Sequence, residues 1–132
     1  MNNMILRNAI QTPDGTILVS RHRHDYVNYV DKNGHTYMVD GGLSYIRRNL
    51  VKDAPYKELS VYDDGTHETR RDVLEWGRNY NKEGKQLSKV EYVFIKDMDD
   101  DHIIKILNRD DLLISDLYRE VFKDELKYRG IN

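Results

Sequence analysis

Residues 20–49 read SRHRHDYVNYVDKNGHTYMVDGGLSYIRRN, and this stretch decides the fold expected for the first half of the chain. Within it, Tyr26–Val30 and His35–Val39 alternate polar and apolar residues, as half-buried strands do. Between them stands Asp31-Lys32-Asn33-Gly34, and Asn-Gly is among the strongest short-range signals for a hairpin turn. The stretch therefore predicts an antiparallel β-hairpin.

A second hairpin is predicted upstream of it. Met4–Ile10 begins an extended segment, and Thr16–Ser20 is a short apolar run rich in β-branched residues. They are joined by Thr12-Pro13-Asp14-Gly15, in which Pro fixes φ and Gly accepts a positive φ. Together the two hairpins predict a four-strand meander.

After the meander, Asp40-Gly41-Gly42 is expected to end the sheet. Leu43–Asn49 is then expected to form one or two helical turns, because apolar residues recur at helical spacing through Leu50. Val51–Tyr56 is expected to be a loop, since Pro55 disfavours a helix before it.

In the second half, Glu58–Tyr62 is expected to form a short strand, His67–Trp76 is longer and alternates imperfectly, and Val90–Ile95 is the most strand-like run. Two helices are predicted at the end of the chain, the first with Asp99–Asp101 at its cap and first turn and the second after the N-cap residue Ser115. Gly130 is expected to stop the last helix.

The predicted fold class is therefore α+β, with an antiparallel β-hairpin and meander N-terminal half followed by a β-β-α-α C-terminal half. We expect one domain over residues 1–132, with a β-rich subregion at 1–56 and a β-β-α-α subregion at 57–132.

Composition narrows the function classes. The net charge of −2 disfavours general affinity for long nucleic acid. The chain has no cysteine, which excludes disulfides and thiolate metal sites. It shows no signal peptide and no long apolar run, so we expect a cytoplasmic protein that does not contact a membrane. Ten tyrosines against two phenylalanines suit interfaces, so a homo-oligomer is expected.

The charge balance reverses locally. Residues 20–52 carry Lys or Arg at 21, 23, 32, 47, 48 and 52, against Asp at 25, 31 and 40. Arg grips phosphate, Tyr or Trp stacks on bases, and backbone N–H groups after a Gly pair can receive an oxyanion. We therefore expect a binding site for a small phosphate-bearing ligand, made by Arg21, His22, Arg23, His24, Tyr26, Gly41, Gly42, Tyr45, Arg47, Arg48 and Trp76. Of the two adjacent arginines, we expect one to grip the ligand and the other to pair with a carboxylate or a neighbouring subunit, and neither to matter much for stability.

The histidines offer two other kinds of site, a metal site and a phosphoesterase site. His22 and His24 with Asp25 or Asp40 match a 2-His-1-carboxylate metal site, but the flanking arginines oppose a cation. His67-Glu68-Thr69 matches once the His-x-Ser/Thr motif that 2H phosphoesterases carry twice, so no catalytic set is predicted.

Two further features of the second half have ordinary structural roles as alternatives to a ligand or metal site. The acidic residues Asp97 and Asp99–Asp101 are explained by the dipole of a helix N-terminus rather than by Ca²⁺ or Mg²⁺. For Arg70-Arg71 and Trp76, a structural role and ligand contact both remain open.

The chain resembles a family of small proteins encoded by tailed bacteriophages, through Arg7–Ile10, Ser20–Tyr26 and Val39–Arg48. Its second half also looks like phage sequence, through Leu74–Gly77, Lys82–Gln86 and Met98–Ile103. Many relatives carry Cys pairs that suggest a zinc ribbon. This chain has none, so hairpin turns would replace the metal staple.

Phage proteins of this size often counter host defence, and one class sequesters the cyclic nucleotide signals of systems such as CBASS and Thoeris. With the polar cluster, the resemblance implies a non-enzymatic anti-defence sponge in the host cell cytoplasm. It would bind a cyclic di- or trinucleotide without cleavage, as a homo-oligomer and without a cofactor or metal. The alternative is a protein–protein inhibitor of a host defence enzyme, which the acidic second half of the chain also suits.

Overall fold

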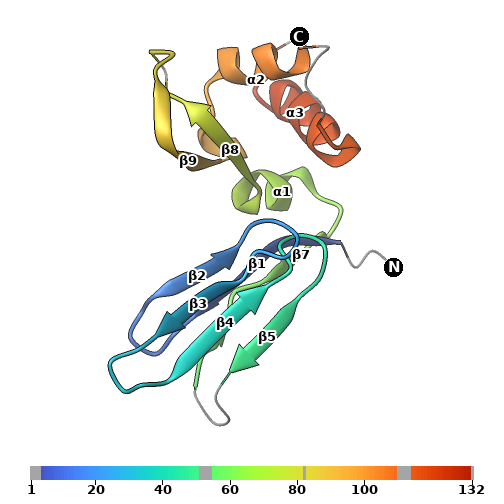
Figure 1. The fold of residues 1–132 in the computed structure, drawn as a ribbon. Coiled ribbons are helices and arrows are strands. Elements are labelled where there is room, and N and C mark those ends of the chain that lie inside the picture. Colours follow the sequence, from blue (N-terminus) through green and yellow to red (C-terminus); the bar gives the residue numbers. More distant parts are fainter. Residues whose placement is uncertain (1–3, 51–54, 82, 110–113, 132) are drawn as a thin grey trace. The chain divides into compact units, whose positions relative to one another are not determined.

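The computed structural model describes residues 4–50, 55–81, 83–109 and 114–131. The chain divides into two compact units, Met1–Asp64 and Gly65–Asn132, so the division falls later than the expected change of subregion after Tyr56. Strands dominate the first unit and helices gather in the second (Figure 1), which is the α+β class predicted from the sequence. No helix within the described residues is long and apolar enough to cross a membrane.

The first unit contains two antiparallel sheets (Figure 1). In one, β1 (Ile5–Gln11) pairs with β2 (Ile17–Ser20), β6 (Lys57–Glu58) and β7 (Val61–Tyr62). In the other, β4 (Thr36–Asp40) lies between β3 (Val27–Val30) and β5 (Arg47–Leu50). Both predicted hairpins are present, but the predicted four-strand meander is wrong, because β2 and β3 belong to different sheets.

The two sheets share one core. It contains Ile10 from β1, Leu18 from β2, and Tyr37 and Val39 from β4, all buried. The Tyr37 hydroxyl donates to Asp31 Oδ2 over 3.3 Å. Burial raises the pKa of Tyr37, and the negative charge of Asp31 raises it further. The tyrosine therefore stays protonated and joins the apolar core to the hairpin turn.

Hairpin turns of one kind recur in both units. Asp31 accepts hydrogen bonds from the N–H groups of Asn33 and His35, both over 2.9 Å, and Gly34 takes a φ of 81°. Asn81 does the same in the second unit, accepting from the N–H groups of Glu83 and Lys85. In each turn, a side-chain acceptor at the first position and a Gly at the fourth position thus fix the register of the two hairpin strands.

The residues after β4 form a turn and a strand, so the predicted helical turns over Leu43–Asn49 are wrong. The Gly41 carbonyl accepts from the N–H groups of Ser44 and Tyr45, and the chain then returns as β5. Pairing with β4 outweighs the local helical spacing, because strand structure depends on neighbours that the local sequence does not contain. Residues 51–54 of the expected loop lie outside the described residues.

The second unit begins with a helix that adds to the predicted β-β-α-α order. The elements are α1 (His67–Val73), β8 (Glu75–Tyr80), β9 (Gln86–Phe94), the short 3-10 helix η1 (Ile95–Asp97), α2 (Asp100–Leu107) and α3 (Asp116–Tyr128). The side chain of Thr66 caps α1 by accepting from the Thr69 N–H. β8 and β9 form an antiparallel hairpin.

The helix ends of the second unit follow the sequence signals. Asp99 is the N-cap of α2, and Ser115 is the N-cap of α3, where its hydroxyl accepts from the Tyr118 N–H over 3.2 Å. Gly130 follows α3 with a φ of 78°, as predicted. The buried apolar residues are Leu74, Ile95, Met98, Ile103, Ile106, Val121 and Phe122.

Candidate functional site

The first unit gathers five polar and aromatic residues where β4 passes into β5. We call them the Arg47 cluster: Asp40, Arg47, Tyr45, His24 and Tyr26. Asp40 ends β4 and lies directly opposite Arg47, the first residue of β5. Opposite residues of an antiparallel pair lie side by side on one face of the sheet. Accordingly, Arg47 Nε lies 3.2 Å from Asp40 Oδ2.

Asp40 anchors this cluster from inside the unit. The residue is fully buried, and its Oδ1 has no hydrogen-bond partner among the described residues. The Tyr45 hydroxyl donates to Asp40 Oδ2 over 3.3 Å, and His24 Nδ1 lies 2.7 Å from the same hydroxyl. Because the hydroxyl has one proton, donation to Asp40 leaves its oxygen to accept from His24. Burial raises the pKa of Tyr45, and the charge of Asp40 adds to that rise.

Arg47 is the exposed member of the cluster. Its side chain is 57% exposed, and its guanidinium carbon lies 5.3 Å from the centre of the Tyr26 ring, which is itself exposed. Contact with Asp40 uses Nε, so the two terminal NH₂ groups keep hydrogen-bond donors for another partner. The arrangement presents a fixed cation and an aromatic ring to the solvent.

Residues 21–25 form a loop beside the cluster. Asp25 shapes it, because its Oδ2 accepts from the Arg21 N–H over 2.8 Å and its own N–H donates to the His22 carbonyl. His24 takes a φ of 64°, the left-handed region that few residues other than Gly adopt. Arg21, His22 and Arg23 are exposed on this loop. It therefore adds positive charge next to Arg47.

The glycine pair holds the loop in place. A Cβ at Gly42, whose φ is 52°, would lie 2.4 Å from the His22 carbonyl carbon, so the loop approaches closer than any other residue allows. The Gly42 N–H donates to Ser20 Oγ, and the N–H groups of Ser44 and Tyr45 donate to the Gly41 carbonyl. The N–H groups of Gly42, Ser44 and Tyr45, three of the donors expected to form an oxyanion cradle after the glycines, are therefore already engaged within the chain.

Arg48 points to the other face of β5, since successive residues of a strand alternate. Its side chain is only 13% exposed, and it donates to Asn8 Oδ1, Glu58 Oε1 and Ser60 Oγ over 2.7, 2.7 and 2.9 Å. Burial opposes ionisation of Glu58, but hydrogen bonds from Ser60 and Arg48 lower its pKa. Arg48 is thus a structural residue, whereas its neighbour Arg47 faces solvent.

Asn8 is a central residue that the sequence analysis did not single out. It is fully buried in β1, and its Nδ2 lies 2.9–3.1 Å from the carbonyl oxygens of Asp40, Gly42 and Tyr45. These contacts fix the turn that carries the Arg47 cluster. The sequence does carry a signal for this role, because an Asn inside an apolar strand needs hydrogen-bond partners when it is buried.

The remaining predicted site residue, Trp76, belongs to the second unit. It lies in β8 and packs edge-on against Tyr118 and Phe122 of α3, with ring centres 5.6 and 5.2 Å away. Tyr118 also donates to the Glu75 carbonyl, and burial, followed by the charge of Glu75, raises its pKa to about 12. Of these two roles for Trp76, its contacts with Tyr118 and Phe122 match the structural one.

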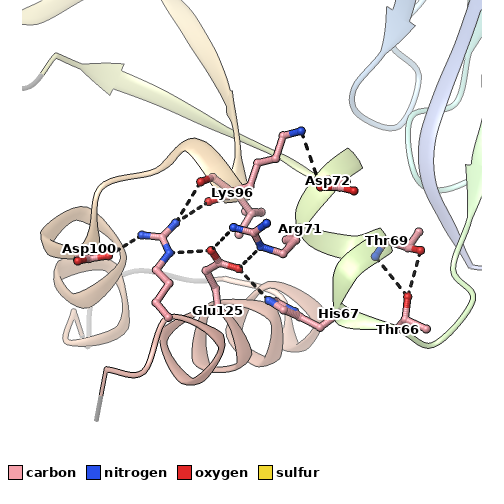
Figure 2. Close-up of polar contacts among 10 residues, drawn as sticks. Thr66, His67, Thr69, Arg71, Asp72, Lys96, Asp100 and Glu125 are labelled. Carbon is pink, nitrogen blue, oxygen red and sulfur yellow. Dashed lines mark hydrogen bonds and ion pairs between the residues drawn. The ribbon is translucent and has the colours of Figure 1, made fainter.

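The second unit has a polar cluster of its own around Glu125 (Figure 2). Glu125 is fully buried in α3. Arg71 donates to both carboxylate oxygens over 2.9 and 3.0 Å, His67 Nε2 lies 2.8 Å from Oε1, and Arg129 Nε lies 2.7 Å from Oε2. We call these four residues the Glu125 cluster. Burial opposes ionisation of Glu125, but the hydrogen bonds from Arg71, Arg129 and His67 outweigh it and lower its pKa to about 2.

Neither a metal site nor a phosphoesterase site is assembled among the described residues. The described residues contain no group of three His, Asp or Glu side chains placed to hold a metal ion. His67, the histidine of the single His-x-Thr motif, lies on α1 and is engaged with Glu125. Arg71 of the Arg70-Arg71 pair is held by the same carboxylate.

Comparison with known proteins does not identify the site. No protein-family model matches the chain, and neither the curated proteins nor the solved structures contain a match to it.

Proposed function

We propose that the first unit binds a cyclic di- or trinucleotide through the Arg47 cluster and the loop of residues 21–25, and holds it without cleaving it. The observation that supports this most is the exposed guanidinium of Arg47, which lies over the exposed Tyr26 ring and is fixed by the buried Asp40. Binding by a fixed group loses less conformational entropy than binding by a mobile one.

The parts of the site suit the parts of such a ligand. The terminal NH₂ groups of Arg47 would take a phosphate, since guanidinium binds phosphate oxygens with two parallel hydrogen bonds. Arg23, exposed on the neighbouring loop, would neutralise a second phosphate. The exposed rings of Tyr26 and His24 offer faces on which a base can stack.

A homo-oligomer belongs to the same proposal. Arg47, Tyr26 and His24 are the exposed members of the Arg47 cluster on one chain, and a cyclic oligonucleotide has two or more repeated faces. A second copy, presenting its own Arg47 and Tyr26, would enclose the ligand from the other side. In this proposal the protein acts as a phage-encoded sponge that removes an immune signal in the host cell cytoplasm.

Thermal-shift and calorimetric titration against a panel of cyclic di- and trinucleotides tests the proposal. We expect one ligand to raise the melting temperature and to be recovered intact after heat denaturation. Arg23→Ala and Tyr26→Ala should each weaken its binding about tenfold, the scale of one charged hydrogen bond or one stacked base. Lys32→Ala, an exposed change in the β3–β4 turn, is the matched control and should bind like the parent. Recovery of a linear product would indicate an enzyme instead, and no response to any cyclic nucleotide would reject the sponge.

A protein–protein inhibitor of a host defence enzyme is the second candidate. It is favoured by the number of exposed tyrosines, because Tyr is enriched at protein interfaces; these are Tyr26, Tyr56, Tyr62, Tyr80, Tyr92 and Tyr128. A pull-down from host lysate distinguishes it. A stoichiometric host protein that stays bound after nuclease treatment and in high salt would support the inhibitor hypothesis. Recovery of the protein with no bound host protein would reject it.

A further inference from the structure

The second unit holds a polar pocket of about 630 Å³ between the end of the β8–β9 hairpin and the first turns of α2 (elements labelled in Figure 1). Its volume lies within the range of small-molecule sites. The hairpin contributes Arg78, Tyr80 and Asn81, and α2 contributes Asp101 and Lys105, among others. We call it the hairpin pocket. It lies apart in the sequence from the Arg47 cluster, and its lining residues take no part in the proposed function.

One part of the pocket is positively charged. Arg78 and Lys105 both line it, together with His102. Burial lowers the pKa of His102, the positive charges of Arg78 and Lys105 lower it further, and the negative charge of Asp99 offsets part of this lowering. His102 is therefore neutral near pH 7, and two cations act on the space around it. Arg78 is held by Glu91 over 2.6 Å, while Lys105 has no ion pair within the described residues. An oxyanion placed between Arg78 and Lys105 would offset their repulsion.

Carboxylates line the same pocket and limit what enters it. Asp100 already pairs with Arg129 over 2.6 Å, so it serves the fold. Asp101, in the first turn of α2, is exposed and has no ion pair in the described part of the chain. A polyanion would be repelled by these carboxylates, and a polycation by Arg78 and Lys105. The charges therefore match a molecule that carries both signs.

We propose that the hairpin pocket binds a small zwitterion, with its oxyanion between Arg78 and Lys105 and its amine directed to Asp101. The oxyanion is a carboxylate or a phosphate ester, since guanidinium and ammonium groups bind both. Neutral His102, which lines the same pocket, would donate a ring N–H to the same oxyanion. The exposed Tyr80 ring covers the apolar part of a bound molecule.

The test is a ¹H–¹⁵N NMR titration of the full chain with the twenty amino acids, phosphoethanolamine and inorganic phosphate as separate probes. We expect at least one zwitterion to give saturable shifts at the amides of Gly84, Asp101 and Lys105, and to raise the ring pKa of His102. Lys105→Met and Asp101→Asn should each weaken binding about tenfold, the scale of one charged hydrogen bond. Lys89→Met, an exposed lysine of β9 that does not line the pocket, should leave binding unchanged.

Three results would overturn the inference. One is the absence of saturable shifts with every zwitterion. Another is inorganic phosphate binding as tightly as the best zwitterion, which would show a site for anions alone. The third is unchanged binding by both Lys105→Met and Asp101→Asn while their spectra keep the dispersion of a folded chain. If either variant loses that dispersion, Lys105→Arg, which keeps the charge, serves as the folded test and should bind within about threefold of the parent.

Discussion

The two units contain clusters built from the same residue types but used differently. In each, a fully buried carboxylate holds an arginine that lies over a tyrosine ring: Asp40 with Arg47 over Tyr26, at 5.3 Å, and Glu125 with Arg71 over Tyr128, at 4.4 Å. In each, a histidine packs on a tyrosine, with His24 5.9 Å from Tyr45 and His67 5.6 Å from Tyr128.

The difference lies in how completely each carboxylate is paired. Both oxygens of Glu125 accept hydrogen bonds, and its arginines, Arg71 and Arg129, are 19% and 17% exposed. Asp40 uses one oxygen only, and Arg47 is 57% exposed. A fully paired, enclosed cluster joins α1 to α3 and stabilises the fold. The open cluster leaves guanidinium donors at the surface, where a ligand can use them.

Removing the negative charge from each cluster should separate the two roles most strongly. Glu125→Gln leaves Arg71 and Arg129 without their counter-charge, and should lower the free energy of unfolding of the second unit by roughly 3–5 kcal/mol. Asp40→Asn should cost the first unit roughly 1–2 kcal/mol, because Arg47 stays hydrated. Urea unfolding measures both. Glu120→Gln is the control on α3, since Glu120 is 62% exposed and its change should cost under about 1 kcal/mol. Equal costs for Asp40→Asn and Glu125→Gln would contradict the comparison.

Acid should remove the contribution of Glu125 in a defined window. Its pKa is lowered from an ordinary 4.5 to about 2 in the folded chain, so its stabilisation is complete above pH 4.5 and is lost as pH falls towards 2. The shift corresponds to about 3 kcal/mol. Urea unfolding followed by the fluorescence of Trp76, the single tryptophan, reports this unit. The stability gap between the parent and Glu125→Gln should narrow across the window. A gap that stays constant would show that Glu125 is not the titrating group.

Much of this fold was predictable because its signals are local. The turns at 12–15 and 31–34, the caps at Asp99 and Ser115 and the stop at Gly130 depend on residues within one turn of each other. The failure at β5 involves a distant partner, because pairing with β4 is not part of the local pattern that suggests a helix. The failure at α1 has a different cause, since its cap at Thr66 is a local signal that the sequence analysis did not use.

The candidate site was predictable in composition but not in geometry. Its types of residue follow from the local excess of Arg, His and Tyr. Which of Arg47 and Arg48 faces solvent depends on strand alternation, and the helical interpretation gave no basis for choosing. Asn8, in β1, bonds to the turn between β4 and β5, and the buried Asp40, at the end of β4, pairs with Arg47. These roles depend on the contact between β1 and β4, which the local sequence does not contain.

Adding a Cβ at Gly42 should disturb the Arg47 cluster and leave the Glu125 cluster unchanged. In Gly42→Ala the new Cβ would meet the His22 backbone at 2.4–2.5 Å in a left-handed conformation, so the first unit should lose roughly 2–3 kcal/mol. Gly34→Ala is the control, because Gly34 has a similar positive φ of 81° and open space around it. It should cost about 1 kcal/mol from the backbone alone. Thermal unfolding compares them. Equal losses would mean that the loop does not rest on Gly42.

The smallest effects should come from the adjacent arginines, which face opposite sides of β5. Lysine keeps the charge of arginine but not its planar fork of donors. In Arg48→Lys, one ammonium cannot serve Asn8, Glu58 and Ser60 together, so stability should fall by roughly 1–2 kcal/mol.

In Arg47→Lys, the lysine still supplies a positive charge opposite Asp40 and stays in solvent, so the free energy of unfolding should change by less than about 1 kcal/mol. The contact of the guanidinium with the Tyr26 ring is lost, and the affinity for the best cyclic nucleotide should fall about tenfold, as expected for one charged hydrogen bond. Arg48→Lys should retain that affinity wherever the chain remains folded. The melting temperature and the calorimetric affinity of both variants show which arginine contacts the ligand and which stabilises the fold. If Arg47→Lys melts early and Arg48→Lys does not, the assignment of the two faces is reversed. If both bind like the parent, the ligand does not use β5.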